Sequence, residues 1–180
     1  MDLKNLVRTI PNFPIEGIMF RDITTVLKDP AGLTASVNQM KEILKDIDFD
    51  IVIGPESRGF IFGVPLALSM GKGFVPVRKI NKLPVGTDDK GNRVETLTKS
   101  YKLEYGETAV EIHKDALKPG QKIVIADDLL ATGGTCKAVC QLVEELNARV
   151  AGLIFFIELD ELKGRETLKN YDVYSLIHYQ

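Results

Sequence analysis

The segment KIVIADDLLATGGT, residues 122–135, combines the residue types that could bind a sugar phosphate. An apolar run leads into two adjacent carboxylates, Asp127 and Asp128, and then into a loop made almost entirely of small residues. Buried carboxylates are costly unless they find hydrogen-bond donors. Small residues let backbone N–H groups curl around an anion at the start of a following helix. An acidic pair beside such an anion cradle predicts a ligand that carries both hydroxyl groups and a phosphate.

Two other interpretations of this segment are open. Paired aspartates at the carboxyl end of a strand can hold Mg²⁺, as in phospho-acceptor signalling domains, but such a site does not require the ATGGT loop directly after the pair. The loop could also be a tight connection in which Gly133 and Gly134 supply positive φ angles. A plain turn would not require both a doubled aspartate and two threonines, so the complete string favours the sugar phosphate.

The elements that must position this segment alternate between strands and helices. Apolar runs predict strands at residues 49–54, 73–79, 122–127 and 150–159. Helical spacing predicts helices from Pro30 to about residue 47, over residues 59–70, and from about residue 134 to 146. Strands without polar alternation are typical of a mostly parallel central sheet flanked by helices on both faces. We therefore expect an α/β fold whose ligand lies at the carboxyl ends of the strands, where the two aspartates fall.

Length and composition limit the class of function. The 180 residues suit one domain, and a formal net charge of −2 gives no general attraction to nucleic acid or to an anionic membrane. The most apolar segment, residues 59–71, is too short to cross a bilayer, and the first ten residues show no secretory apolar core. Cys136 and Cys140 have no further metal-ligating residue nearby and should pack as small apolar residues. We expect a cytoplasmic enzyme or binding protein.

Strings along almost the whole chain resemble one protein family. IVIADDLLATGGT resembles the phosphoribosyl-diphosphate (PRPP) binding motif of type I phosphoribosyltransferases. Within this family, the chain most closely resembles the adenine phosphoribosyltransferase branch. The strings that carry this resemblance are NFPIEGIMFRDIT (12–24), VLKDP (26–30), PESRGFIFG (55–63), VRKINKLP (77–84), SYKLEYGE (100–107), EIHKDALKPGQ (111–121) and ELKGRETL (161–168). The resemblance implies the type I phosphoribosyltransferase fold for residues 1–180, with a small N-terminal hood (12–24) that binds the base and a mobile β-hairpin arm (82–107).

The resemblance also implies roles for the residues around PRPP. Asp127 and Asp128 would accept hydrogen bonds from the ribose 2- and 3-hydroxyls and so take part in catalysis. The 5-phosphate cradle would comprise Ala131, Thr132, Gly133, Gly134 and Thr135. The pyrophosphate would face Arg58, Arg78, Lys79 and Lys82, with Mg²⁺ bound mainly through the diphosphate rather than directly by the protein. Taken alone, the basic residues of RKINK are typical of a solvated strand end. A cis peptide between Glu56 and Ser57 is a further implication.

The base would lie against the hood. The resemblance implies that the backbone at Met19 and Arg21 reads the edge of the adenine ring, while Phe20 and Leu129 pack on its two faces. By composition alone, Ile18, Met19 and Phe20 would be an ordinary apolar strand.

Glu104 matches a catalytic glutamate on the arm, which closes over the site and is proposed to interact with N7 of the base. A carboxyl group there could move a proton during attack by N9. The alternative is a solvent-facing glutamate on a strand. The chain departs from the family at VGTDDKGNRV, residues 85–94, because the family runs almost directly from KLP into GETL. The DDKGN core predicts a hairpin tip, so the arm should be longer than usual, and the partners of Glu104 and Lys82 stay open.

The implied reaction is the purine salvage step that converts adenine and PRPP to AMP and pyrophosphate, catalysed by a homodimer. One alternative is a 6-oxopurine phosphoribosyltransferase acting on hypoxanthine, guanine or xanthine. The other is a non-catalytic regulator that senses PRPP. Such a regulator needs an element that reads nucleic acid, and the segment before residue 30 has neither the length nor the basic charge for one.

Overall fold

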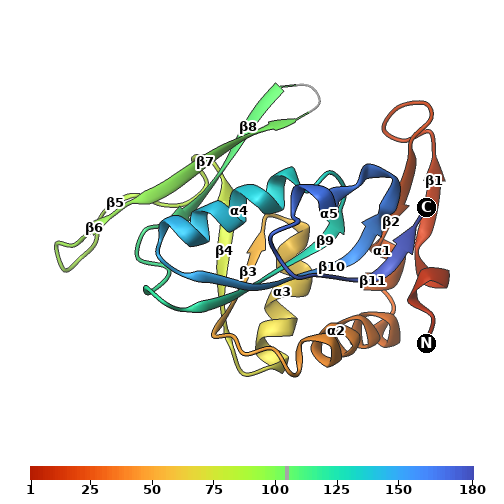
Figure 1. The fold of residues 1–180 in the computed structure, drawn as a ribbon, viewed down its shortest axis with the longest axis horizontal. Coiled ribbons are helices and arrows are strands. Elements are labelled where there is room, and N and C mark those ends of the chain that lie inside the picture. Colours follow the sequence, from red (N-terminus) through yellow and green to blue (C-terminus); the bar gives the residue numbers. More distant parts are fainter. Residues whose placement is uncertain (104–105) are drawn as a thin grey trace.

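A seven-stranded sheet forms the centre of the computed structural model, which describes residues 1–103 and 106–180 (Figure 1). Five neighbouring strands run parallel, in the order β11 (Val173–Tyr179), β10 (Arg149–Leu159), β9 (Lys122–Leu130), β3 (Ile51–Pro55) and β4 (Gly73–Lys79). Two antiparallel strands, β8 (Gly106–His113) and β7 (Thr96–Leu103), extend the sheet beyond β4. The predicted α/β fold with a mostly parallel central sheet is confirmed.

Helices cover both faces of this sheet. One face carries α2 (Pro30–Leu44) and α3 (Arg58–Ser69), and the other carries α4 (Gly134–Glu145). Short elements complete the chain: η1 (Leu3–Leu6), α1 (Thr24–Leu27), η2 (Asp160–Leu162) and α5 (Gly164–Thr167). In the described part of the chain, no helix combines the length and apolar character needed to cross a membrane.

Alternate side chains of β9 enter opposite cores. Ile123 and Ile125 pack in the cluster that contains the buried side of α4, whereas Val124 and Ala126 pack in the cluster that contains α2 and α3. Successive side chains of a strand point to opposite faces, so a strand covered on both sides must be apolar at every position. This explains the unbroken apolar run IVIA, residues 123–126, before the aspartates.

Two boundaries differ by three residues from the sequence-based prediction, whereas the other predicted elements agree with it within two residues. Helix α2 begins at Pro30 as predicted, capped by the Asp29 carboxylate, which accepts a hydrogen bond from Ala31 N at 3.2 Å. It ends at Leu44 rather than at residue 47. Strand β9 continues to Leu130, beyond the predicted end at residue 127, because β10 is long enough to pair with it as far as that residue. The acidic pair therefore lies inside a strand and not after one.

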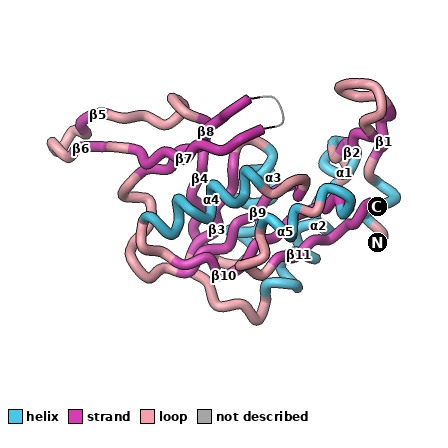
Figure 2. Tube along the Cα trace, turned by 45° about the horizontal axis from the view of Figure 1, so that its top comes forward, coloured by secondary structure: helices cyan, strands magenta, loops and turns pink. Residues whose placement is uncertain are grey.

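Two β-ribbons lie at opposite ends of the molecule (Figures 1 and 2). At one end β1 (Arg8–Pro11) pairs with β2 (Met19–Asp22), close to both chain termini. At the other end β5 (Gly86–Thr87) and β6 (Arg93–Val94) prolong the ribbon formed by β7 and β8. The predicted hairpin tip is confirmed, since Asp88 N donates to Asn92 O at 2.9 Å between β5 and β6. Cis peptides join Phe13 to Pro14 and Glu56 to Ser57, the second as the resemblance implied.

Candidate active site

A pocket of about 270 Å³ lies at the carboxyl ends of β3 and β9, where an α/β sheet of this kind is expected to bind its ligand. It brings together most residues that were predicted to bind PRPP, namely Arg58, Lys79, Asp127, Asp128, Ala131, Thr132, Gly133, Gly134 and Thr135. Leu129, which was predicted to pack on the base, lines the same pocket. No ligand-binding role was predicted for the other lining residues, which are Pro55, Glu56, Ser57, Tyr101, Leu130, Cys136 and Phe155. Both cysteines are buried free thiols.

The acidic pair is held by its own strand and by α3. Asp127 Oδ1 accepts a hydrogen bond from Asp128 N at 2.8 Å, and Asp128 Oδ2 forms an ion pair with Arg58 Nε at 3.0 Å. Burial, together with the neighbouring Asp128 carboxylate, raises the pKa of Asp127 well above its usual value. Burial also raises the pKa of Asp128, although Arg58 opposes the effect. A ligand that presents hydroxyl donors would relieve this electrostatic cost.

The loop after the pair is shaped for close approach of its backbone. Gly133 caps α4 with a φ of +83°, and a side chain there would place its Cβ 2.9 Å from Gly164 O. Only glycine satisfies both conditions. The first backbone N–H groups of α4 have no acceptor within the helix, and Gly134, Thr135 and Cys136 line the pocket. The loop and the helix start therefore provide donors for an anion.

Tyr101 joins the arm to this loop. The Thr135 hydroxyl donates to Tyr101 Oη at 3.1 Å, and the aromatic ring of Tyr101 lies next to Gly134. Tyr101 belongs to the SYKLEYGE string, but its partner is 34 residues away in the sequence, so no local pattern reveals the contact. Glu104, three residues further along the arm, lies outside the described residues.

The predicted pyrophosphate residues divide into two groups. Arg58 and Lys79 line the pocket, whereas Arg78 and Lys82 are not among its lining residues. Arg78 Nε donates to Glu56 Oε2 at 2.7 Å, and Arg78 Nη1 donates to Lys82 O at 3.1 Å. Arg78 and Lys82 thus lie in a segment that is hydrogen-bonded to Glu56, a lining residue of the pocket.

The hood forms a second pocket of about 280 Å³ against the end of the chain. Met19 and Arg21 line it, with the Arg21 guanidinium 3.9 Å from the centre of the Tyr179 ring. The other lining residues, for which no individual ligand-binding role was predicted, are Gly17, Ile18, Leu159, Glu161, Leu162, Tyr179 and Gln180. Phe20 lies on the alternate face of β2, with its ring 5.1 Å from that of Phe13 in an edge-to-face arrangement. Leu129 lines the pocket at the end of β9 and is not a lining residue of the hood pocket.

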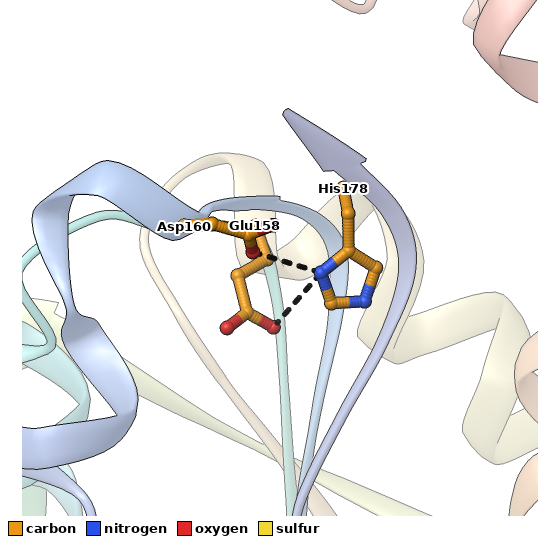
Figure 3. Close-up of side chains that lie close together, drawn as sticks. All are labelled: Glu158, Asp160 and His178. Carbon is orange, nitrogen blue, oxygen red and sulfur yellow. Dashed lines mark hydrogen bonds and ion pairs between the residues drawn. The ribbon is translucent and has the colours of Figure 1, made fainter. Parts of the chain in front are cut away.

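One cluster outside both pockets brings together three side chains that could act as metal ligands, Glu158, Asp160 and His178. Figure 3 shows His178 Nδ1 facing Asp160 Oδ1 at 2.9 Å and Glu158 Oε2 at 3.8 Å. The buried Glu158 carboxylate already accepts hydrogen bonds from Arg165 Nε at 2.7 Å, Arg165 Nη2 at 2.8 Å and Ser175 Oγ at 2.6 Å. Its oxygens are occupied, so the cluster is an ion-pair network that fixes the turn after β10.

Comparisons with known proteins agree with this geometry. Residues 22–178 match the phosphoribosyl transferase domain family. The adenine phosphoribosyltransferase of Clostridium perfringens is 57% identical over 179 residues, which are 99% of this chain and 99% of that protein. The adenine phosphoribosyltransferase of Lachnoclostridium phytofermentans is 52% identical over 177 residues, covering 98% and 97% of the two chains.

Solved structures give the same result. The crystal structure of adenine phosphoribosyltransferase from Thermoanaerobacter pseudethanolicus matches with a TM-score of 0.91 and 49% identity, covering 98% of each chain. The Saccharomyces cerevisiae adenine phosphoribosyltransferase, complexed with an imino-altritol bisphosphate and adenine, matches with a TM-score of 0.86 and 40% identity over 96% of this chain and 95% of that one. From its full-length relatives, its fold and its acidic pair beside an anion cradle, this chain belongs to the adenine phosphoribosyltransferase family.

Proposed function

We propose that this chain converts adenine and PRPP to AMP and pyrophosphate. The observation that carries the proposal is the pocket at the end of β9, where the acidic pair, the 131–135 loop and two cations lie together. A sugar phosphate with a charged leaving group requires all three features. Membership of the adenine phosphoribosyltransferase family supports the same reaction.

The ribose 5-phosphate part of PRPP would bind to β9 and α4. Asp127 and Asp128 would accept hydrogen bonds from the 2- and 3-hydroxyls, and charge-assisted bonds of this kind are among the stronger ones. The backbone N–H groups of residues 131–135 would surround the 5-phosphate at the positive end of α4. These contacts fix the sugar on both sides of C1, where the bond breaks.

The leaving pyrophosphate would lie on the basic side of the pocket. Arg58 and Lys79 line the pocket itself, and Arg78 and Lys82 would supply charge from the adjoining segment. The chain fits Mg²⁺ best as a partner of the diphosphate, because two of the three carboxylates that line the pocket are already paired, Asp128 with Arg58 and Glu56 with Arg78. When bound, Mg²⁺ would offset the negative charge of the leaving group.

Adenine would lie between the hood and β9. The backbone at Met19 and Arg21 would read the 6-amino edge, with Phe20 and Leu129 on the two faces of the ring. Glu104 would move the proton at N7 as N9 attacks C1. The transition state has oxocarbenium character, and positioning plus electrostatic stabilisation would supply most of the acceleration.

The test is incubation with PRPP and Mg²⁺ against adenine, hypoxanthine, guanine and xanthine in parallel. A 6-oxo group reverses donor and acceptor at the edge of the ring, so adenine should be preferred by about tenfold to a hundredfold. Comparable turnover of hypoxanthine would favour the 6-oxopurine alternative. Tight PRPP binding with no turnover of any base would favour the regulator.

We also propose that the enzyme is a cytoplasmic homodimer. Three apolar side chains of α3, spaced three and four residues apart, are exposed to solvent: Ile61 at 37%, Val64 at 46% and Leu68 at 80%. Apolar side chains along one face of a helix are typical of an interface. Light scattering should give the mass of two chains for the wild type, and Leu68→Glu should shift it toward one. An unchanged dimer in that variant would exclude this face.

A further inference from the structure

The segment that carries Lys82 is attached to the sheet without being a strand of it. Strand β4 ends at Lys79, and its backbone pairing with β8 covers Arg78 with Glu111 and Lys79 with Val110. Residues 80–81 then form a turn and residues 82–84 follow as irregular chain, without ladder pairing in the described structure. A segment of this kind holds one position only if other groups bind its backbone.

Side chains of β8 bind that backbone. Glu111 Oε1 accepts hydrogen bonds from Lys82 N at 3.1 Å and from Leu83 N at 3.0 Å. His113 Nε2 lies 2.9 Å from Pro84 O, which can only accept, so this ring nitrogen is the donor. Glu111 and His113 are two residues apart and therefore point from the same face of the strand. Both belong to the EIHKDALKPGQ string (111–121), and neither has a role in the proposed binding of substrates or in the proposed catalysis.

The same segment is fixed from the side of the pocket. Glu56 Oε1 accepts from Lys79 N at 2.9 Å, and Glu56 Oε2 accepts from Arg78 Nε. Burial would raise the pKa of Glu56, but these hydrogen bonds hold it below its usual value, so the group is a carboxylate at neutral pH. Arg78 Nη1 in turn donates to Lys82 O. Lys82 thus has both its backbone N–H and its backbone carbonyl bound by side chains.

We propose that Glu111 is a positioning residue for pyrophosphate: by binding the backbone of Lys82 and Leu83, it places the Lys82 ammonium group on the leaving-group side of the PRPP pocket. Glu111 is buried, with 5% of its surface exposed, and its bound donors are the two amides of this segment. Burying a carboxylate costs free energy unless it accepts hydrogen bonds, and the backbone N–H groups of Lys82 and Leu83 supply these bonds to Glu111. The inference rests on the proposed function, because Lys82 is assigned to pyrophosphate there.

The experiment compares the binding of two ligands that use different halves of the pocket. Dissociation constants for pyrophosphate with Mg²⁺ and for ribose 5-phosphate are measured by titration calorimetry on Glu111→Ala and Glu111→Gln. The amide of Glu111→Gln keeps an oxygen that can accept from both N–H groups. Lys114→Ala is the matched control, since Lys114 lies just after the same strand and its ammonium group forms an exposed ion pair with Glu95.

Glu111→Ala should weaken pyrophosphate binding by about tenfold or more, because misplacement of a positioned group by about 1 Å has effects of that size. Ribose 5-phosphate binding should stay within about twofold, and Glu111→Gln should restore pyrophosphate binding to within about threefold. Equal weakening of both ligands by Glu111→Ala would overturn the inference as a general structural effect. Unchanged pyrophosphate binding would overturn it as well.

A double-mutant cycle tests whether Glu111 acts through Lys82. Glu111→Ala should add little to the loss of pyrophosphate affinity that Lys82→Ala already causes, because coupled residues are non-additive. Additive losses would overturn the inference. If circular dichroism shows that Glu111→Ala is unfolded, His113→Ala takes its place in the cycle. A non-additive loss of pyrophosphate affinity with Lys82→Ala is again expected, and an additive loss would again overturn the inference. Failure of the wild type to make AMP would instead overturn the proposed function, since the binding measurements do not depend on turnover.

Discussion

The Nε atom of Arg58 lies 3.0 Å from Oδ2 of Asp128, so the first residue of α3 is joined to the acidic pair of β9. Asp128 is nearly inaccessible at 7% side-chain exposure, whereas the Arg58 side chain is 44% exposed. The cation therefore compensates one buried carboxylate while it stays within reach of a ligand. Asp127 has a different environment, because its bound donor is the backbone N–H of Asp128. The two aspartates should respond differently to substitution.

Asp127→Asn should stabilise the unliganded protein and impair PRPP binding. The amide carries no charge to bury, and its oxygen can still accept from Asp128 N, so the melting temperature should rise. The KM for PRPP should increase by about tenfold or more, because a charge-assisted contact to the ribose is lost. Differential scanning fluorimetry and initial rates measure the two effects, with Asp115→Asn as the exposed control. A lower melting temperature with intact activity per folded molecule would mean that Asp127 is structural.

The stability difference between the wild type and Asp127→Asn should shrink as the pH falls. The folded-state pKa of Asp127 is raised by burial and by the charge of Asp128. A carboxyl group with a raised pKa contributes its full stability below its unfolded value of about 4 and loses it as the pH rises through the folded value. Melting temperatures of both proteins at several values between about pH 8 and pH 5 measure the effect. A difference that does not depend on pH would contradict the assignment of the cost to a buried charge.

Tyr101→Phe should weaken PRPP binding without unfolding the protein. The variant removes only the hydroxyl that accepts from Thr135, and the ring can still pack beside Gly134. The KM for PRPP should rise by about threefold to tenfold, in keeping with the loss of one hydrogen bond at a phosphate site. Lys99→Ala, on the same strand and in an ion pair with Glu145, serves as the control. If the KM for adenine rises instead, Tyr101 acts on the base and not on the cradle.

Asp22→Ala should impair adenine binding more than PRPP binding. The Asp22 carboxylate accepts from Thr24 N, Thr24 Oγ1 and Arg8 Nε, each at 2.9 Å, and so joins the hood to the start of α1.

The Thr24 backbone hydrogen bond, the Thr24 hydroxyl and Arg8 together lower the pKa of Asp22 to about 2. Its contribution to stability should therefore persist above about pH 4 and disappear as the pH falls toward 2.

The measurement for the hood is the ratio of the two KM values, with Glu16→Gln in the exposed hood loop as the control. A change of less than about twofold in the KM for adenine, in a folded Asp22→Ala protein, would argue against the hood as the base site.

Shortening residues 85–94 to the family's usual length should leave the fold intact and adenine turnover within about tenfold. The tip is held by its own contacts, since Asp88 Oδ1 accepts from Lys90 N at 2.9 Å and from Asn92 N at 2.7 Å. The Arg93 side chain forms an exposed ion pair with Glu95. The opposite outcome would be a folded, dimeric variant with a far larger loss of turnover. Lys90 or Arg93 would then contribute charge where pyrophosphate leaves.

The sequence by itself determined the elements and the centre of the site. Apolar runs and helical spacing record which side of an element is buried, so strands β3, β4, β9 and β10, helices α2, α3 and α4, and the burial of β9 on both sides followed from patterns within a few residues. The acidic pair and its glycine loop were also local, because one strand, one turn and one helix start place them together.

Only the tertiary structure decided which side chains meet across the fold. Arg58 reaches Asp128, Tyr101 reaches Thr135, and Glu111 binds a backbone 29 residues away, none of which any local pattern encodes. The extension of β9 past the aspartates likewise depends on the length of β10 beside it. The reason is physical: local propensity and burial fix the course of each element, whereas a hydrogen bond between distant residues exists only after the elements have packed.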